Sequence, residues 1–454
     1  MFATLTYRKN NEMATVSYGN GVRTAYSYDQ LGRTTRIHTW NSTATLLDLN
    51  YAYDANGNPT GVNGGGETYG YDELNRLTSA SGPFGTLSYS YDQVGNRLSE
   101  VVNGTGTTTY SYGNYNKLLS AGSATYTYDN NGNTVSKSSD SNSWTYAYDY
   151  ENRLKQVNLN GQSVLQALYD GDGRRIQTVT GDTTVYHYLA GSWDSAYVKD
   201  LSTGVTTDIV FAGGFRVGKV QGGVNYYYHL DRLGSVRLVT QSANIQSFTA
   251  KYLPYGTPYG TSGSESFQYT GKQLDVSTGL YYYGYRYYDG EVGRFISEDK
   301  VPQRPNAPLN PGGIARSQVL DEYGSEPLQP QSLNLYVYAM NNPLRYVDPT
   351  GGQALLPILE FFVMILEFIA EYAPEIGEIA SEVVAEEIIK TAPAANTLNQ
   401  LTTAGPRTTG AILEGTYQRG AQLTGQLGRN LGNSVRPDKL QLGSEAQHAE
   451  RESS

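Results

Sequence analysis

The chain of 454 residues has no cysteine and only four histidines, and these two shortages exclude much of the usual chemistry of thiol and metal sites. Without cysteine it forms no disulfide and binds no metal through thiolates. The histidines are His38, His187, His229 and His448. None is spaced as a pair of metal ligands, which argues against a zinc enzyme or a histidine-triad enzyme. We therefore expect neither a metal site nor another cofactor.

Positive charge and long apolar runs are also scarce. The chain has 33 Lys and Arg against 43 acids, a formal net charge of −10, which argues against nucleic acid or an anionic membrane as a partner of the fold. No uncharged run reaches the roughly 18 residues that a bilayer-spanning helix needs. Residues Met1–Asn10 lack the apolar stretch of a secretory signal, so we expect export to the medium or cell surface by a non-classical route.

Tyrosine and glycine, by contrast, are abundant, with 41 and 51 residues. Many of the tyrosines fall in a Tyr-x-Tyr-Asp phrase that returns roughly every 20 residues, a period typical of repeat architectures. Complete copies are Tyr26–Asp29, Tyr51–Asp54, Tyr69–Asp72, Tyr89–Asp92, Tyr126–Asp129 and Tyr146–Asp149, and incomplete copies are Tyr110–Gly113 and Tyr169–Asp170. Most copies are followed within a few residues by Gly-Arg, Asn-Arg or Gly-Asn.

Each copy has the pattern of a β-hairpin. Tyr, Thr and Val alternate with small or polar residues, and Asp, Asn and Gly supply the turn. One hairpin cannot bury its own apolar face, whereas stacked hairpins can, so the sequence predicts a wound sheet or solenoid. We expect the repeat Asp to accept hydrogen bonds from the turn backbone, and the following Arg to pair with that carboxylate or a neighbouring one.

The repeats give way to denser phrases in the second half of the chain. The most distinctive are Tyr281–Asp289, Gly293–Asp299, Asn334–Pro343 and Val347–Gly351. We assign the repeats to residues 1–215, a core region to 216–352 and a C-terminal region of different composition to 353–454. Residues 301–331, rich in Pro, Asn and Ser, are expected to form a loop within the core region.

Over roughly residues 20–352, the repeats and these phrases in order resemble an Rhs or YD-repeat protein with the Rhs-associated core domain, as in polymorphic toxins and the C component of insecticidal toxin complexes. The resemblance implies a mainly β fold, a hollow shell or spiral sheet that encloses and delivers a variable C-terminal toxin in interbacterial competition. It also implies that the core region closes one end of the shell and carries a self-cleaving aspartyl protease. The implied partners are the chain's own tail, a secretion-apparatus or toxin-complex partner and an immunity protein.

The candidate protease residues lie around one predicted hairpin. An aspartyl protease needs two carboxylates close enough to share a proton, and Asp289 and Asp299 stand at the two ends of this hairpin, whose turn is Gly290–Gly293. A turn centred between Glu291 and Val292 places Asp299 opposite Gly284 and on the face of Arg286, whereas a three-residue loop places it on the face of Asp289.

Arg286 has two opposing interpretations. As part of a protease it could orient the scissile carbonyl or stabilise its oxyanion. Alternatively, Arg286, Asp289, Arg294 and Asp299 form a structural ion-pair ladder across the hairpin. The resemblance favours the span from Arg286 to Asp299 as catalytic, but the family carries an acid after the Arg, where this chain has Tyr287, and Pro at the positions of Gly290 and Lys300.

The resemblance also implies a cleavage point at an Asp-Pro-x-Gly phrase followed by an apolar residue. Asp348, Pro349 and Gly351 match this phrase, and Gly352 stands where the apolar residue is expected. We therefore predict one autoproteolytic turnover near Gly351–Gly352. The other interpretation of the phrase is a turn that ends the last strand.

The C-terminal region predicts helix rather than strand. Between residues 354 and 390 glutamates recur at spacings of seven and four, which indicates an amphipathic helix or a helix pair interrupted at Pro374. Residues 391–454 indicate a flexible tail without a recognisable catalytic motif. Because an acidic face is repelled by anionic lipid, a membrane is not the expected partner.

Two other functions fit the repeats. Tyr-rich strands could present aromatic rings to cell-surface carbohydrate. The chain could also be a purely structural YD-repeat module without catalysis, because about eight repeats are few for a closed shell.

Overall fold

The computed structural model describes residues 2–9, 12–188, 193–212, 215–241, 245–299 and 334–352. The predicted loop at 301–331, the helix at 354–390 and the tail at 391–454 lie outside these residues. The chain divides into two units, of which the first comprises Met1–Leu5, Thr15–Asp29 and Arg33–Ile365. The second comprises Thr6–Ala14, Gln30–Gly32 and Leu366–Ser454. All that follows concerns the first unit.

The described residues are mainly β, as predicted. One long sheet contains β1 Ala3–Tyr7, β2 Met13–Tyr18, β3 Arg23–Tyr28, β4 Thr34–Trp40, β5 Thr45–Tyr53, β6 Pro59–Val62, β7 Glu67–Tyr71, β8 Leu77–Gly82, β9 Gly85–Tyr91, β10 Arg97–Val102, β11 Gly106–Tyr112, β12 Leu118–Ala121, β13 Ala124–Tyr128, β14 Thr134–Ser139, β15 Asn142–Tyr148, β16 Leu154–Leu159, β17 Gln162–Tyr169, β18 Arg175–Thr180, β19 Asp182–Tyr188, β20 Ser195–Asp200, β21 Thr206–Ala212, β22 Phe215–Gln221, β23 Val224–Leu230, β24 Val236–Thr240, β25 Gln246–Tyr252 and β26 Pro258–Gly263.

A second, small sheet follows it. Its strands are β27 Gln273–Asp275, β28 Leu280–Tyr282, β29 Tyr287–Asp289 and β30 Arg294–Phe295. Short 3-10 turns lie at η1 Asn63–Gly65, η2 Asn114–Asn116, η3 Tyr269–Gly271 and η6 Ala339–Asn341. The long sheet, called the wall below, therefore runs to Gly263, beyond residue 216 where the core region was expected to begin.

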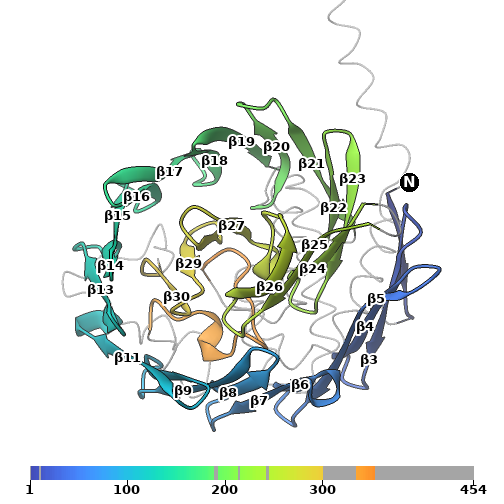
Figure 1. Ribbon diagram of the computed structural model, residues 1–454, viewed down its shortest axis with the longest axis horizontal. Coiled ribbons are helices and arrows are strands. Elements are labelled where there is room, and N and C mark those ends of the chain that lie inside the picture. The colour runs from blue at the N-terminus through green and yellow to red at the C-terminus, as the bar shows by residue number, and fades with distance from the viewer. Residues whose placement is uncertain are drawn as a thin grey trace, which may run out of the picture. The chain divides into compact units, whose positions relative to one another are not determined.

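The wall is a meander in which consecutive strands pair antiparallel. A register shift recurs at the second tyrosine of the repeats, for example between Ser27 and Tyr28 and between Ala147 and Tyr148. Such bulges increase the local twist and bend the strand. Repeated once per hairpin, they fit a sheet that curves round, as Figure 1 shows.

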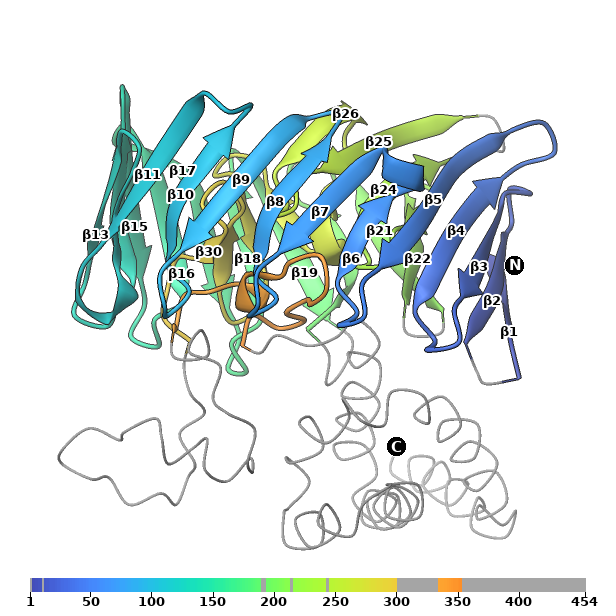
Figure 2. The same ribbon diagram turned by 90° about the horizontal axis from the view of Figure 1, so that it is seen from below.

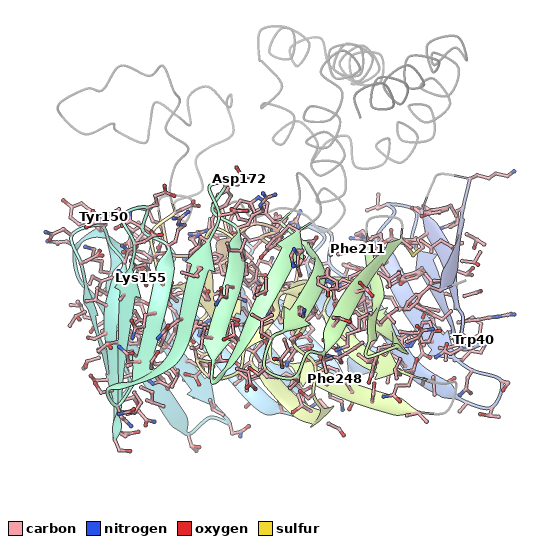
Figure 3. All side chains as sticks on the ribbon, turned by 90° about the horizontal axis from the view of Figure 1, so that it is seen from above. Trp40, Tyr150, Lys155, Asp172, Phe211 and Phe248 are labelled. Carbon is pink, nitrogen blue, oxygen red and sulfur yellow. The ribbon has the colours of Figure 1, made fainter. Side chains whose placement is uncertain are left out.

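The turns of the repeats have the predicted chemistry. Asp72 accepts the backbone N–H of Arg76 at 2.9 Å through Oδ1 and the Arg76 Nε at 2.7 Å through Oδ2. Arg76 Nη1 also donates to the backbone carbonyl of Asp92, in the next repeat, at 2.6 Å. Where Asn replaces Arg, as at Asn58, the amide binds the repeat carboxylate in the same way. Tyr150 and Asp172, at the tips of two such turns, lie along one rim of the wall (Figure 3).

Removing one of these carboxylates should test their contribution to stability. We expect Asp72→Ala to lower the free energy of unfolding by about 2 kcal/mol, because three hydrogen bonds to the carboxylate are lost and a mostly buried guanidinium keeps no acid partner. Urea unfolding measures this, with Asp182→Ala at an exposed position as the control. Equal losses in the two variants would contradict the assignment.

The second tyrosine of each repeat links one hairpin to the previous one. Its hydroxyl donates to a backbone carbonyl just past the preceding turn, in the pairs Tyr53 with Thr34, Tyr71 with Pro59, Tyr91 with Leu77, Tyr112 with Arg97, Tyr169 with Leu154, Tyr188 with Arg175 and Tyr252 with Val236. The abundance of tyrosine is thus explained by a repeated long-range bond rather than by an aromatic surface.

The wall closes on itself through side chains. The contacts form a seam of Tyr18, Asn20 and Thr24 on one side and Tyr228, His229 and Thr240 on the other. The Tyr18 hydroxyl donates to the Tyr228 carbonyl at 2.8 Å, and Asn20 Nδ2 donates to Thr240 Oγ1 at 3.0 Å. His229 lies fully buried between Thr24 and Thr240. The last strands, β24–β26, continue inside the first ones, where Tyr255 packs with Leu77 and Leu87 (Figure 1).

The space that the wall encloses in the described residues is packed by the core region. One cluster joins Tyr146, Leu154, Val157 and Leu165 of the wall to Leu280, Tyr282, Tyr287 and Ile296. A second joins wall residues of β11–β13 to Val292. Cavities between the two parts are small, about 10 and about 30 Å³. The fold is therefore a wall around a plug rather than an empty shell in this part of the chain.

Residues Asn334–Asn342 form a strap along the rim of repeat turns (Figure 2). Its asparagines bind successive turns: Asn334 binds Asn96, Asn341 binds the Gly95 carbonyl, and Asn342 binds Asn58 and the Asn75 carbonyl. The Tyr336 hydroxyl donates to the Gly132 carbonyl at 2.7 Å. The strap thus connects turns that are far apart in sequence.

Candidate functional site

Arg286 lies at the centre of the predicted site, on the loop between β28 and β29, and is only 5% exposed. Its Nε donates to the Gly351 carbonyl and its Nη1 to the Leu335 carbonyl at 2.8 Å. The guanidinium carbon stands 3.6 Å from the centre of the Phe295 ring. Burial lowers the pKa of Arg286, and the nearby Asp299 and Asp348 carboxylates oppose that shift.

Two carboxylates share one end of this guanidinium. Nη2 lies 3.4 Å from Asp299 Oδ2 and 3.3 Å from Asp348 Oδ2. The Asp348 Oδ1 accepts the backbone N–H groups of Gly351 at 2.8 Å and Gly352 at 3.0 Å. The predicted cleavage peptide is therefore held on both sides, at its carbonyl by Arg286 and at its N–H by Asp348.

Two glycines allow this close approach. Gly351 has φ +79°, and a Cβ there would lie 3.0 Å from the Tyr283 Cβ and 3.1 Å from the Arg286 nitrogen. Gly284 has φ +92°, and its Cβ would lie 2.9 Å from the Thr350 carbonyl. Since that carbonyl also accepts the Tyr285 N–H at 2.9 Å, the cleavage segment and the Arg286 loop meet backbone to backbone. Pro349 lies nearby, lining the cavity of about 30 Å³.

Asp289 lies in a different environment. Its Oδ2 is 3.1 Å from Lys137 Nζ on β14, and it raises the pKa of that lysine. Pairing of Asp289 with Arg294 and of Tyr288 with Phe295 gives the register in which Asp299 lies opposite Gly284, the first of the two alternatives. Asp289 thus binds the plug to the wall, and the carboxylate that approaches Asp299 is Asp348.

Of the predicted ion-pair ladder, Arg286 pairs with Asp299, whereas its other members contact the wall. Arg294 donates to Asn96 at 3.1 Å and to the Asn116 carbonyl at 2.6 Å. Tyr287, at the position where the family carries an acid, accepts Arg175 Nη1 at 2.8 Å. A Cβ on Gly290 would lie 3.1 Å from the Tyr255 carbonyl, which explains the small residue there.

The sequence did not predict that Asp348 would bind Arg286. The only signal was the Asp-Pro-Thr-Gly phrase, in which an acid two to four residues before N–H groups is typical of a capped turn. Within the described residues, no cluster of His, Asp or Glu is arranged to hold a metal ion. The same residues contain no helix long and apolar enough to cross a bilayer.

Comparison with known proteins identifies the family. Residues 60–344 match the teneurin YD-shell family. The tRNA3(Ser)-specific nuclease WapA of Bacillus spizizenii is 32% identical over 76% of this chain and 14% of that protein. Toxin subunit YenC1 of Yersinia entomophaga is 25% identical over 76% of this chain and 42% of the subunit.

Solved structures show the same fold. The Tc holotoxin pore of Photorhabdus luminescens has a chain that superposes with a TM-score of 0.60 at 23% identity, over 77% of this chain and 19% of that one. A TcdB2-TccC3-Cdc42 structure superposes with a TM-score of 0.59 at 22% identity, over 81% of this chain and 20% of that one. This chain thus spans less than half the length of each of these relatives. It belongs to the YD-shell family and is an Rhs/YD-repeat protein like those of toxin complexes.

Proposed function

We propose that this chain is the plugged part of a YD shell that shields and delivers a C-terminal effector segment, and that it cuts itself once between Gly351 and Gly352. The observation that carries the cleavage is the Gly351 carbonyl held by buried Arg286, whose guanidinium also contacts Asp299. Support for delivery comes from relatives whose names are nuclease and toxin subunit.

The cleavage is hydrolysis of one peptide bond. A water oxygen adds to the Gly351 carbonyl carbon while Asp299 accepts the water proton, and Arg286 stabilises the oxyanion. The C–N bond then breaks and the proton passes to the Gly352 nitrogen, leaving a carboxylate and an amine. Asp348, which accepts the Gly352 N–H, keeps the leaving nitrogen in place. Residues Asp299 and Arg286 are the catalytic groups of this proposal, and Asp289 is a contact between plug and wall.

Shielding follows from the position of the plug. Because the core region packs the described interior, a shielded segment needs space beyond it, enclosed by further repeats or by a partner subunit. A toxin-complex subunit is the partner we propose, by analogy with the TcdB2-TccC3 structure. Such a protein acts outside the cell that makes it.

Intact-mass spectrometry of the purified, denatured chain tests the cleavage. We expect the wild-type chain to give two fragments joined at Gly351–Gly352 and Asp299→Asn to stay whole, because the amide cannot accept the water proton. Asp289→Asn is the matched control and should still be cut, since its carboxylate binds Lys137. An uncut wild-type chain overturns the proposal, and a break lost in Asp289→Asn alone points to the other acid.

A further inference from the structure

One tyrosine of the wall departs from the rule of the repeats. Tyr148 stands where the second tyrosines donate to a carbonyl of the preceding repeat, yet its buried hydroxyl bonds to no other described residue. By its position the acceptor would be the carbonyl of Thr134. The Thr134 N–H donates instead to the Ile296 carbonyl at 2.8 Å, so the plug reaches the wall at this repeat.

The Tyr148 side chain lines the cavity of about 10 Å³ between wall and plug. On the plug side the cavity is lined by Arg286, its two preceding residues and Ser297. Tyr169 lines it from the wall as well, but its hydroxyl already donates to the Leu154 carbonyl at 2.6 Å. The volume is close to the minimum for one water molecule, and a buried water requires polar partners, which the hydroxyl and the neighbouring backbone provide.

We propose that the Tyr148 hydroxyl holds one water molecule in this cavity, and that this water positions the Arg286 loop for cleavage. The second part rests on the proposed function. A buried hydroxyl without a partner destabilises the fold, and a bridging water satisfies it almost as well as a direct bond. The water connects the wall to the loop at the place where the loop meets the cleavage segment, so it limits movement of the Arg286 Nε away from the Gly351 carbonyl.

Tyr148 is thus a positioning residue. It does not touch the scissile peptide, and its effect passes through Arg286. A displacement of about 1 Å between reacting groups can cost about 100-fold in rate, so loss of one bridging water is expected to slow cleavage about 10-fold.

Diffraction from crystals of the Asp299→Asn chain tests the water site without any need for cleavage. We expect an ordered water within hydrogen-bond distance of the Tyr148 hydroxyl and of a group on the Arg286 loop or Ser297. A hydroxyl bonded directly to protein, or a cavity without density in a map that shows other buried waters, overturns the proposal.

Cleavage kinetics test the positioning role. In a cell-free synthesis reaction sampled over time, Tyr148→Phe should release the fragments about 10-fold more slowly while its urea midpoint stays that of the wild type. The matched control, Tyr169→Phe, should have a lower urea midpoint and an unchanged cleavage rate, because its hydroxyl serves the wall alone.

Wild-type cleavage by Tyr148→Phe, or equal slowing in both variants, overturns the positioning role. If the wild-type chain is never cut, the proposed function fails, and the diffraction experiment still decides the water site.

Discussion

Arg175→Met is expected to lower the free energy of unfolding by about 3 to 5 kcal/mol, the loss typical of breaking a buried ion pair from one side. Arg175 is fully buried, and its Nη1 contacts Asp275 Oδ2 at 2.5 Å and the Tyr287 hydroxyl at 2.8 Å. Its guanidinium also stands over the Tyr282 ring at 4.2 Å. Burial raises the pKa of Asp275, so the carboxylate left behind would bind a proton or stay charged in an apolar site. Urea unfolding at neutral pH measures the loss.

The double variant Arg175→Met with Asp275→Leu separates a lost pair from a lost packing unit. Because Arg175 Nε and Nη2 have no hydrogen-bond partner among the described residues, the pair is incompletely satisfied, and apolar replacement of both should recover most of the stability. The two single changes should therefore be strongly non-additive. Additive losses would show that the two side chains act independently.

Acidification is expected to destabilise the fold through His229 at the seam. The ring is fully buried between Thr24 and Thr240, and burial lowers the pKa of His229 to about 3. The unfolded chain binds this proton near the ordinary histidine pKa of about 6.5. Stability is therefore unaffected by this group above pH 6.5 and falls by about 1.4 kcal/mol per pH unit between 6.5 and 3, or about 3 kcal/mol by pH 4.

The control for this pH dependence is His187, which is exposed on β19 beside Tyr197. Unfolding free energy is measured from pH 8 to pH 4 in wild type, His229→Gln and His187→Gln. We expect His229→Gln to lose about 3 kcal/mol of the acid-induced decrease and His187→Gln to keep it. Parallel curves for wild type and His229→Gln would mean that the buried ring accepts a proton in the folded protein.

Local chemistry made the repeats predictable from sequence. The Asp of each repeat and the Arg or Asn four residues later meet within one turn, so their contact depends on no distant part of the chain. The same turn continues where the acid is lost. The N–H of Leu253 bonds to the Thr257 carbonyl just as the N–H of Asp72 bonds to that of Arg76, so turn geometry extended the wall beyond the recognisable phrases.

The candidate site was only partly predictable because its members come from distant segments. The register of β29 and β30 follows from hairpin geometry, and it was one of two alternatives that the sequence left open. The contact of Asp289 with Lys137 joins residues 152 apart, and that of Arg286 with Asp348 joins residues 62 apart. No periodicity links such positions, and each contact depends on how the plug is seated in the wall.

The strap turns the number of repeats in one arc into a fixed quantity. An extra hairpin between Asn58 and Gly132 would satisfy its own turn and its two neighbouring strands, so the sheet alone would accept it. It would also move Gly132 away from Tyr336 while Asn342 stayed on Asn58. The strap is thus a ruler of set length laid across an extensible lattice, and variation in the repeat number of this arc requires a matching change in a peptide that does not itself repeat.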